Sequence, residues 1–429
     1  TMLGGLALFI YGMNLMSDGL QKSAGERMKN ILALLTRNPV LGVLAGALCT
    51  AVLQSSSATT VMVIGFVSAG LMSLRQAISI ILGANIGTTI TAQLIAFSIG
   101  DYAWAFVAVG FVMYFFLKKK EFLSYLGQTI FAFGVLFVGI NIMGGAMKPL
   151  AGSPVFIDLM TQVHDIPVLG VLLGTLMTVV VQSSSATIAV LQNLASTAGP
   201  DGVTSIIGLT GALPILFGDN IGTTITAVLA SIGGSLAAKR TAAAHVVFNI
   251  TGTFIFIWFI PYYAKFIQFI SPDGAEIDVI SRQIANAHSC FNIFNTILFI
   301  PIIGILVKVV TKIVPGKELE RMPSDPIFLD HNVLDRPFAA IHLATKEIIR
   351  LAEMTFTMIR DAQKAFVGGD REAADKVKQA EENVNVLQEH IVNYLAGMFT
   401  ADTITEEQSA KVSGLLHIAA DIEHIGDHC

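Results

Sequence analysis

One short polar stretch occurs twice in this sequence, each time inside an otherwise apolar segment. The copies are Gln54-Ser55-Ser56-Ser57-Ala58-Thr59 and Gln182-Ser183-Ser184-Ser185-Ala186-Thr187, and the residues before them also align without a gap. Hydroxyl and amide oxygens are ligands for a hard cation such as Na⁺. Hydroxyl donors beside a helix N-terminus suit an oxyanion. The alternative is that Ser and Thr are small packing residues of membrane helices, which two copies in register disfavour.

A second polar motif follows each copy of the first. It reads Gly83-Ala84-Asn85-Ile86-Gly87-Thr88-Thr89 in one half and Gly218-Asp219-Asn220-Ile221-Gly222-Thr223-Thr224 in the other. Glycine permits the helix to unwind in both copies, and Asn and Thr would then supply oxygens to a cation; helix–helix contact through Gly and Thr is the alternative. Two motifs repeated in the same order indicate a duplicated membrane unit, with its binding site where the halves meet.

The charge balance limits what such a site can hold. No Lys or Arg occurs between Pro149 and Ala238, so an anion at the second hydroxyl cluster would lack a cationic side chain. Cations that bind with the anion would offset its charge, which predicts ion coupling. Asp219 is an ionisable residue inside a predicted span, where the first copy has Ala84. We expect a Na⁺ ligand or a proton site there, with a structural acid as the alternative, and two unequal cation sites.

Other polar residues in apolar segments form a weaker group. His245 and Asn249 share one helix face, and so do His288, Asn292 and Asn295. We interpret these residues as hydrogen-bonding partners between helices rather than as ligands.

The composition indicates an all-α, polytopic membrane protein. Hydrophobic residues make up 53% of the 429 residues, charged residues 13%, and the mean hydropathy is +0.69. Soluble domains carry about 25% charged residues. The net charge of -5 comes mostly from a charged tail after about Pro323 and predicts no nucleic-acid partner. The three cysteines lie far apart and predict no disulfide framework; the first and last residues look like cut ends of a longer chain.

Seven stretches are predicted to cross the membrane, most near the ~20 residues that a span needs: 1–20, 76–98, 101–117, 121–147, 205–232, 241–262 and 287–312. The stretches 39–74 and 167–199 are too long for one helix and carry a serine cluster near the middle. We therefore predict two re-entrant hairpins, whose irregular backbone must be buried or line a wet cavity. Three crossings separate them, so the hairpins enter from opposite faces and the repeat is inverted, as in alternating-access transporters.

Positive charges orient this scheme. If the 22–37 loop is cytoplasmic, most Lys and Arg residues fall inside, as the positive-inside rule expects. The N-terminus is then outside and the tail inside. We divide the chain into a first transmembrane repeat at 1–120, a second at 121–265, a final transmembrane helix at 287–312 and a cytoplasmic helical domain at 325–429.

The tail is predicted to form three helices that pack as a bundle. Each carries an apolar stripe, and the stripe residues are Ile341, Ile348, Ile349 and Met358, then Val377, Val384, Leu387, Ile391 and Leu395, then Leu415, Leu416, Ile418, Ile422 and Ile425. Near the end, Glu423 and Asp427 lie one turn apart beside two histidines. Such a pair is able to hold a metal ion, and a solvated helix face is the alternative.

The two repeated motifs, followed by His245-Val246-Val247-Phe248-Asn249, resemble the bacterial type II sodium–phosphate cotransporters over about 1–312. The tail, with Asp421-Ile422-Glu423-His424-Ile425-Gly426-Asp427-His428, resembles part of a PhoU-type helical domain. The resemblance implies Na⁺-coupled import of inorganic phosphate into a bacterial cell through its inner membrane. It also implies a divalent or iron-type metal at Glu423 and Asp427.

The resemblance also implies site residues, motif by motif. The phosphate ligands would be Ser55, Ser56, Ser57, Ser183, Ser184 and Ser185. The sodium ligands would be Gln54, Thr59, Asn85, Thr88, Thr89, Gln182, Thr187, Asp219, Asn220, Thr223 and Thr224. Asp219 departs from the small residue expected at its position.

Two other functions stay open. One is a Na⁺-coupled carrier of another anion, such as a dicarboxylate or amino acid, although such sites commonly use an Arg and none is found near the midplane. The other is a membrane-anchored regulator whose tail senses metal, forms a homodimer or binds a signalling partner. We expect no enzyme, because no His lies near the hairpin serines to serve as a base. The expected partners are therefore phosphate, Na⁺ and the lipid bilayer.

Overall fold

The computed structural model describes the chain except for residues 25–37, 98–99, 148, 150–151, 317–321 and 401–403. The described residues form α-helices and short 3₁₀ turns without a β-strand, which confirms the predicted all-α class. They divide into two compact units. Unit 1 comprises Thr1–Thr60, Leu74–Ile232 and Lys239–Val314; unit 2 comprises Val61–Ser73, Gly233–Ala238 and Pro315–Cys429. Part of the 22–37 loop, on which the predicted orientation depends, lies outside the described residues.

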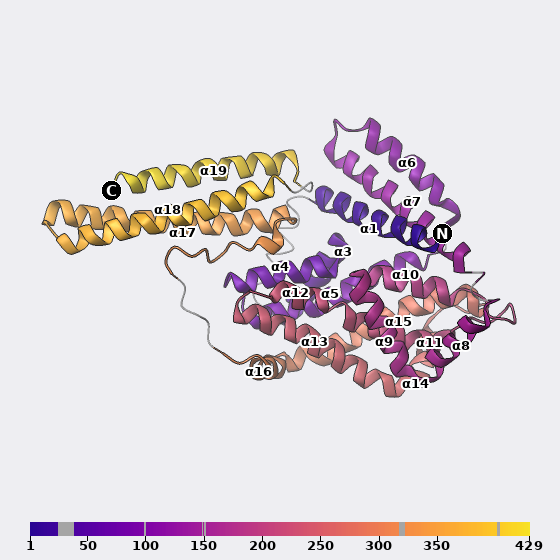
Figure 1. The fold of residues 1–429 in the computed structure, drawn as a ribbon. Helices are drawn as coiled ribbons and strands as arrows, with labels where there is room; N and C mark the ends of the chain where they lie inside the picture. Colours follow the sequence, from indigo (N-terminus) through magenta and orange to yellow (C-terminus); the bar gives the residue numbers. More distant parts are fainter. Residues whose placement is uncertain (25–37, 98–99, 148, 150–151, 317–321, 401–403) are drawn as a thin grey trace. The chain divides into compact units, whose positions relative to one another are not determined.

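The helices before the tail are labelled in Figure 1. Their bounds are α1 Met2–Ala24, α3 Pro39–Leu53, α4 Ser56–Ser68, α5 Leu74–Ile95, α6 Ala103–Phe116, α7 Glu121–Met147, α8 Pro154–Asp165, α9 Pro167–Val181, α10 Ser184–Ala195, α11 Gly208–Gly222, α12 Ile225–Ser231, α13 Leu236–Phe256, α14 Ile260–Ile270, α15 Glu276–Phe299 and α16 Ile303–Ile313.

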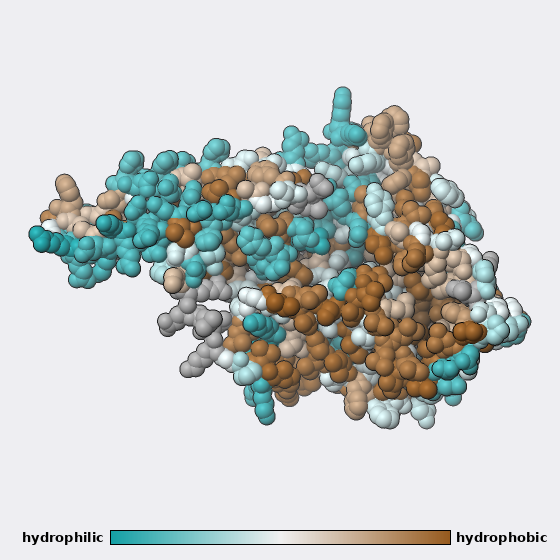
Figure 2. Space-filling view, in the orientation of Figure 1, coloured by the Kyte–Doolittle hydropathy of each residue, from teal (hydrophilic) through white to brown (hydrophobic). Residues whose placement is uncertain are grey.

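The apolar helices make this a multi-pass membrane protein. Among the described residues, five helices are long and apolar enough to cross a membrane, or six if the bent pair α8 and α9, at 110°, counts as one span. Figure 2 shows a largely hydrophobic surface over the helices of unit 1. Large apolar side chains such as Trp104, Trp258 and Phe269 are 69%, 69% and 87% exposed. Lipid is the solvent in which such exposure costs little.

Several helices extend beyond the predicted spans. The helix that contains the predicted span 287–312 begins at Glu276 and is broken at Ile300–Ile302, where Pro301 removes a backbone donor. The span 241–262 begins at Leu236, breaks at Ile257–Phe259 and resumes through Ile270. The amphipathic helix α8 was not predicted. The ends of these helices carry charged or polar residues. A hydropathy criterion assigns such residues to loops, although the backbone there is helical.

Repeated glycines let two helix pairs approach closely. A Cβ on Gly83 in α5 would lie 1.9 Å from the carbonyl oxygen of Val43 in α3. A Cβ on Gly218 in α11 would lie 2.0 Å from the carbonyl oxygen of Val171 in α9. All four helices carry a Gly-x-x-x-Gly pattern, which permits backbones to touch in a membrane. The helices that lead into the serine clusters, α3 and α9, are therefore fixed against the helices that bear the asparagine motifs.

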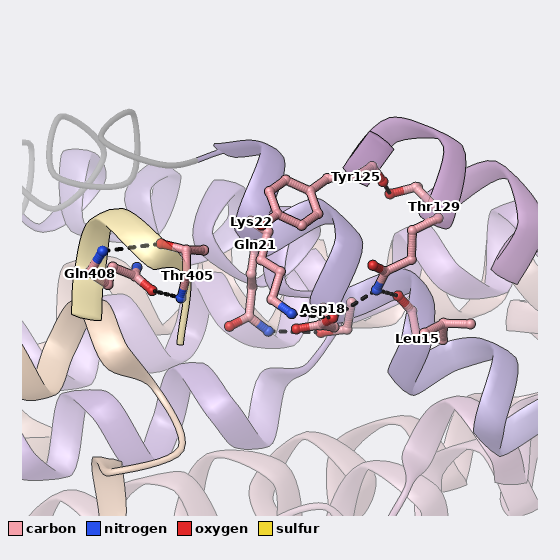
Figure 3. A network of polar contacts seen from close by, with 10 residues as sticks. Leu15, Asp18, Gln21, Lys22, Tyr125, Thr129, Thr405 and Gln408 are labelled. Atoms are coloured by element: carbon pink, nitrogen blue, oxygen red, sulfur yellow. Dashed lines mark hydrogen bonds and ion pairs between the residues drawn. The ribbon is translucent and has the colours of Figure 1, made fainter. Parts of the chain in front are cut away.

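A polar cluster joins α1 to α7, also in unit 1 (Figure 3). Gln128 donates to Asp18 Oδ2 at 2.7 Å and to the Leu15 carbonyl at 3.1 Å. Lys22 pairs with the same carboxylate oxygen at 3.0 Å. The carboxylate of Asp18 is therefore compensated inside the helix pair, as a charge in an apolar unit must be.

Unit 2 contains the three predicted tail helices, α17 Pro337–Gly368, α18 Arg371–Met398 and α19 Glu406–Asp427. Gly369, with φ +63°, ends α17, and Asp370 caps α18. A Thr405–Gln408 capping box begins α19 (Figure 3). The predicted stripe on α19 is wrong in part, because Ile418 and Ile425 are 47% and 50% exposed, whereas Leu415, Leu416 and Ile422 are half-buried. The buried residues there are Val412, Ala419 and Gly426, and on α17 Ile349 is exposed.

A buried carboxylate fixes the segment that precedes α17. Glu347 is 0% exposed and accepts hydrogen bonds from the backbone N–H groups of Ile327 and Phe328 at 2.8 and 2.6 Å. Arg350 donates to its other oxygen at 2.6 Å. The carboxylate is thus both paired and hydrogen-bonded, the condition under which a buried charge is stable.

Candidate functional site

The first serine cluster lies at a break between two short helices. α3 ends at Leu53, and Gln54 adopts a left-handed conformation with φ 51° and ψ 26°. Its side-chain Nε2 donates to the Ala51 carbonyl at 2.5 Å and so closes the end of α3. Ser55 then accepts from the Ala58 N–H at 3.1 Å and so begins α4. One glutamine and one serine thus end one helix and start the next.

The second serine cluster repeats this geometry. Gln182 has φ 57° and ψ 25°, and its Nε2 donates to the Val179 carbonyl at 2.6 Å. Ser183 accepts from the Ala186 N–H at 3.2 Å as the N-cap of α10. In the described part of the chain, Gln54 and Gln182 are the non-glycine residues with positive φ. The left-handed conformation costs such a residue about 1–2 kcal/mol, so its presence in both copies marks a functional candidate.

The two breaks leave groups that suit an anion. The hydroxyls of Ser56, Ser57, Ser184 and Ser185 make no hydrogen bond within the described residues. They stand in the first turn of α4 or α10, where backbone N–H groups also lack helical partners. Ser184 and Ser185 are each 8% exposed and Ser56 is 6% exposed. Hydroxyl donors, helix N-termini and shielding from water together favour a small oxyanion.

A pair of threonines supports each break. Thr50 lies 2.9 Å from Thr59, and Thr178 lies 2.9 Å from Thr187, between hydroxyl oxygens. All four are at most 1% exposed. The sequence analysis included Thr59 and Thr187 but missed Thr50 and Thr178. The signal was present, because Thr50 and Thr178 align with each other in the ungapped repeat.

Asp219 makes the second copy different from the first. Its carboxylate is 0% exposed and Oδ1 accepts from the Thr178 hydroxyl at 2.6 Å. Oδ2 has no partner in the described part of the chain. In the first copy the corresponding residue is Ala84, and Thr50, the counterpart of Thr178, donates to the Thr59 hydroxyl at 2.9 Å. A carboxylate with a free oxygen beside two hydroxyls suits a cation or a proton.

The predicted unwinding at the asparagine motifs occurs in one copy. α5 passes through Asn85, Thr88 and Thr89 without a break, whereas α11 ends at Gly222 and α12 starts at Ile225. In the intact helix, Thr91 donates to Gln54 Oε1 at 3.0 Å. The aligned Thr226 donates to the Thr223 carbonyl at the break instead. As a result Gln54 is 8% exposed, whereas Gln182 is exposed.

The asparagines and threonines of both motifs bond mainly to their own helix. Asn85 and Asn220 donate to carbonyls four residues back, each at 2.8 Å. The threonine hydroxyls donate to carbonyls three or four residues back: Thr88 to Ala84, Thr89 to Ile86, Thr223 to Asp219 and Thr224 to Ile221. Asn85 also contacts His245, and Asn220 contacts Asn292. Hydrogen bonds between helices, which the sequence predicted for His245 and Asn292, are thereby confirmed.

The second break is tied to the first repeat. Gln192 of α10 donates to the Ala92 carbonyl of α5 at 3.1 Å and to the Ser281 carbonyl of α15 at 3.0 Å. A cavity of about 580 Å³ adjoins this junction. Its walls come from α5, α7, α10 and α15 and include Asp101, Asn141, Gln192, Asn193 and Asp278. The structure therefore brings α10 beside α5 and α15. Convergence of the two serine clusters on one point stays a prediction.

The predicted metal pair lies on α19. Ligand atoms of Glu423, His424 and Asp427 lie within 4.8 Å of one another. Asp427 and His424 are exposed and Glu423 is intermediate. His424 Nδ1 is 3.9 Å from Glu423 Oε2. Carboxylate and imidazole groups are suitable ligands for a metal ion. Exposed acidic helix faces also bring such groups together where no metal ion binds.

Family models match both parts of the chain. The model described as Na⁺/Pi-cotransporter matches twice, over residues 8–145 and 141–270. Each match contains one copy of both repeated motifs. The model described as PhoU domain matches residues 348–429.

Curated relatives include proteins named for phosphate transport. The putative inorganic phosphate export protein YjbB of Escherichia coli (strain K12) is 25% identical over 427 residues, 99% of this chain and 76% of that protein. The uncharacterized protein YqeW of Bacillus subtilis (strain 168) is 36% identical over 271 residues, 63% of this chain and 85% of that protein. The sodium-dependent phosphate transport protein 2B of Homo sapiens is 40% identical over 105 residues, 23% of this chain and 15% of that protein. No solved structure matches.

Proposed function

Because this chain belongs to the Na⁺/Pi-cotransporter family, we propose that it is a secondary transporter that moves inorganic phosphate together with Na⁺ by alternating access. The observation that carries this proposal is the duplicated helix break. Each break presents serine hydroxyls and a helix N-terminus where the flanking helices are apolar. In this proposal the two breaks are the tips of two inverted re-entrant hairpins.

The division of labour follows from charge. Ser55, Ser56 and Ser57, with Ser183, Ser184 and Ser185, donate hydrogen bonds to phosphate oxygens. No Lys or Arg occurs between Pro149 and Ala238, so the negative charge is offset by Na⁺ ions that bind with the phosphate. Their ligands are the glutamine, threonine and asparagine oxygens of the two motifs and the carboxylate of Asp219. No residue has a catalytic role in this mechanism.

The direction of transport follows from the Na⁺ gradient in a symporter. We propose import into a bacterial cell through its inner membrane, with the N-terminus outside and the tail in the cytoplasm. Export is the second candidate, because the YjbB relative, which spans the tail as well, is named for phosphate export. A Na⁺-coupled carrier of a dicarboxylate remains a rival for the substrate.

Proteoliposomes test the proposal. Radiolabelled phosphate should accumulate when Na⁺ is higher outside and should not when K⁺ replaces Na⁺. Reversing the Na⁺ gradient on preloaded vesicles distinguishes a reversible symporter from a one-way exporter. Competition by aspartate but not by arsenate would favour the carboxylate rival, and phosphate flux that ignores Na⁺ would contradict ion coupling.

We assign the tail a regulatory rather than a transporting role. Residues 325–429 would act as a cytoplasmic domain that binds a signalling partner or a second copy, with a metal at Glu423 and Asp427. This part of the proposal depends on the PhoU match over residues 348–429.

A further inference from the structure

A third duplicated pattern lies outside the two motif pairs. Both α13 and α15 carry His-x-x-Phe-Asn-x-x-x-Thr, and the residues are His245, Phe248, Asn249 and Thr253, then His288, Phe291, Asn292 and Thr296. Every one of these side chains is at most 5% exposed. The His, Asn and Thr positions are spaced by four, so each helix presents one buried polar stripe.

The stripe on α13 contacts both repeats. His245 Nε2 lies 3.2 Å from Asn85 Nδ2 and 3.4 Å from Asn85 Oδ1. Two turns further along, the Thr253 hydroxyl donates to the Phe217 carbonyl at 3.3 Å. Asn85 belongs to α5 and Phe217 to α11. One helix therefore holds the asparagine motif of the first repeat and the backbone of the second.

The stripe on α15 makes corresponding contacts with the repeats exchanged, although Asn292 rather than His288 is the partner of the motif asparagine. Asn292 Nδ2 donates to Asn220 Oδ1 at 3.1 Å, and the Thr296 hydroxyl donates to the Leu82 carbonyl at 3.3 Å. Leu82 and Phe217 occupy the same place, three residues before the motif asparagine. α13 and α15 are thus equivalent partners of α5 and α11, which Figure 1 labels in unit 1.

Both stripes leave the same atoms unpaired. His Nδ1 and Asn Oδ1 of each copy, in His245, Asn249, His288 and Asn292, have no partner in the described part of the chain. A buried polar atom without a partner costs free energy. Apolar side chains would pack these helices at less cost, so packing alone does not account for the stripes. The contacts of His245 to Asn85 and of Asn292 to Asn220 give two of these four residues a role beyond packing.

We propose that the two His-x-x-Phe-Asn-x-x-x-Thr helices form a cross-brace that orients Asn85 and Asn220 and so couples the two repeats. The inference rests on the proposed function, in which these asparagines belong to the coupling-ion site. His245 and Asn292 are positioning residues, because they act through the asparagines. Loosening the brace weakens ion binding more than it slows transport at saturating Na⁺.

The test measures phosphate uptake in proteoliposomes against Na⁺ concentration. His245→Phe and Asn292→Leu each keep the side-chain volume and remove one contact to a motif asparagine. We expect the half-saturating Na⁺ concentration to rise about fivefold, which corresponds to losing one ordinary hydrogen bond. His245→Gln keeps a polar group within reach and should restore most of the affinity. Thr311→Val, which removes a local bond on exposed α16, is the control.

A binding readout separates this inference from the proposed function. Na⁺ that binds the folded state raises its melting temperature by mass action, and the brace variants should need about fivefold more Na⁺ for the same rise. If the wild type shows this rise without phosphate uptake and the brace variants still need more Na⁺ for the same rise, the proposed function fails and the brace stands. If uptake is Na⁺-coupled but folded variants keep the half-saturating Na⁺ within about twofold, or lower only the maximal rate, the brace is overturned.

Smaller changes guard against misfolding of those variants. Thr253→Val and Thr296→Val are isosteric and each removes one hydroxyl that ties a stripe to the opposite repeat. They should raise the half-saturating Na⁺ concentration in the same direction. Unchanged Na⁺ dependence in both would contradict the coupling part of the proposal.

Discussion

At the residue scale, two glutamines and two serines explain why the polar stretches are not helical. Gln54 and Gln182 bond back to the helix that they end, and Ser55 and Ser183 cap the helix that follows. The remaining serines are left free for a ligand. The same four-residue sequence thus encodes both the break and the donors that the break exposes.

The serine donors give the first prediction. Ser184→Ala, and equally Ser56→Ala, should lower phosphate uptake at least about tenfold, because a hydrogen bond to a charged group contributes about 1.5–3 kcal/mol. Uptake into proteoliposomes at fixed Na⁺ measures this. Ser153→Ala is a matched control, since Ser153 precedes α8 and makes no side-chain cap. Full uptake by both folded variants would refute the site assignment.

The single carboxylate gives the second prediction. Asp219→Asn keeps an acceptor for the Thr178 hydroxyl and removes the charge. We expect the half-saturating Na⁺ concentration to rise about tenfold or more, since a charged ligand contributes about 1.5–3 kcal/mol. Asp158→Asn, on an exposed face of α8, controls for surface charge. An unchanged Na⁺ dependence would make Asp219 a structural acid.

At the element scale, close backbone contact sets the site. α3 lies against α5 and α9 against α11 because glycines face carbonyl oxygens in both pairs. The asparagine motifs lie on α5 and α11, so the distance between serine cluster and asparagine motif depends on these contacts. A helix pair that is held apart by a methyl group would misplace both.

The glycine contacts give the third prediction. Gly83→Ala or Gly218→Ala should lower the melting temperature in detergent, because overpacking typically costs about 1–3 kcal/mol. Gly304→Ala on α16 is the matched control, since nothing lies within 4 Å of the position that its Cβ would take. There the change should be neutral or slightly stabilising. Equal melting temperatures for all three variants would contradict the close approach.

At the scale of the whole molecule, an apolar unit and a charged helical tail have different stabilising interactions. Unit 1 is rich in glycine contacts and exposed apolar side chains. The tail helices of unit 2 use capped ends, a buried Glu347 and surface pairs such as Lys376 with Glu372. A hydrophilic surface covers much of α17, α18 and α19 in Figure 2. The exposed apolar side chains of unit 1 suit a lipid environment, and the charged surface of the tail helices suits water.

The tail gives the fourth prediction. A chain that ends before residue 325 should keep part of its Na⁺-dependent phosphate uptake, because every proposed phosphate and Na⁺ ligand lies before that residue. Uptake normalised to the amount of folded protein in the vesicles measures this. Complete loss of uptake by well-folded truncated protein would favour the regulator class.

The sequence by itself determined the helical membrane class, the two duplicated motifs and the family resemblance, and it singled out Asp219 as a candidate ligand. Polar residues in apolar segments are conspicuous without a structure, because placing them in lipid costs free energy and they are therefore rare there. Exact helix ends were less predictable, since Glu276 and Asp278 begin α15 although their charge suggests a loop.

Only the tertiary structure decided how the two copies differ. α5 stays helical, and its Thr91 hydroxyl donates to Gln54 Oε1. α11 breaks, and the Thr226 hydroxyl donates to the nearby Thr223 carbonyl instead. It also identified Thr50 and Thr178 as the partners of Thr59 and Thr187, and it showed that α13 and α15 both contact α5 and α11. Nearly identical local sequences cannot specify such differences, because each depends on which distant helix supplies the next hydrogen-bond partner.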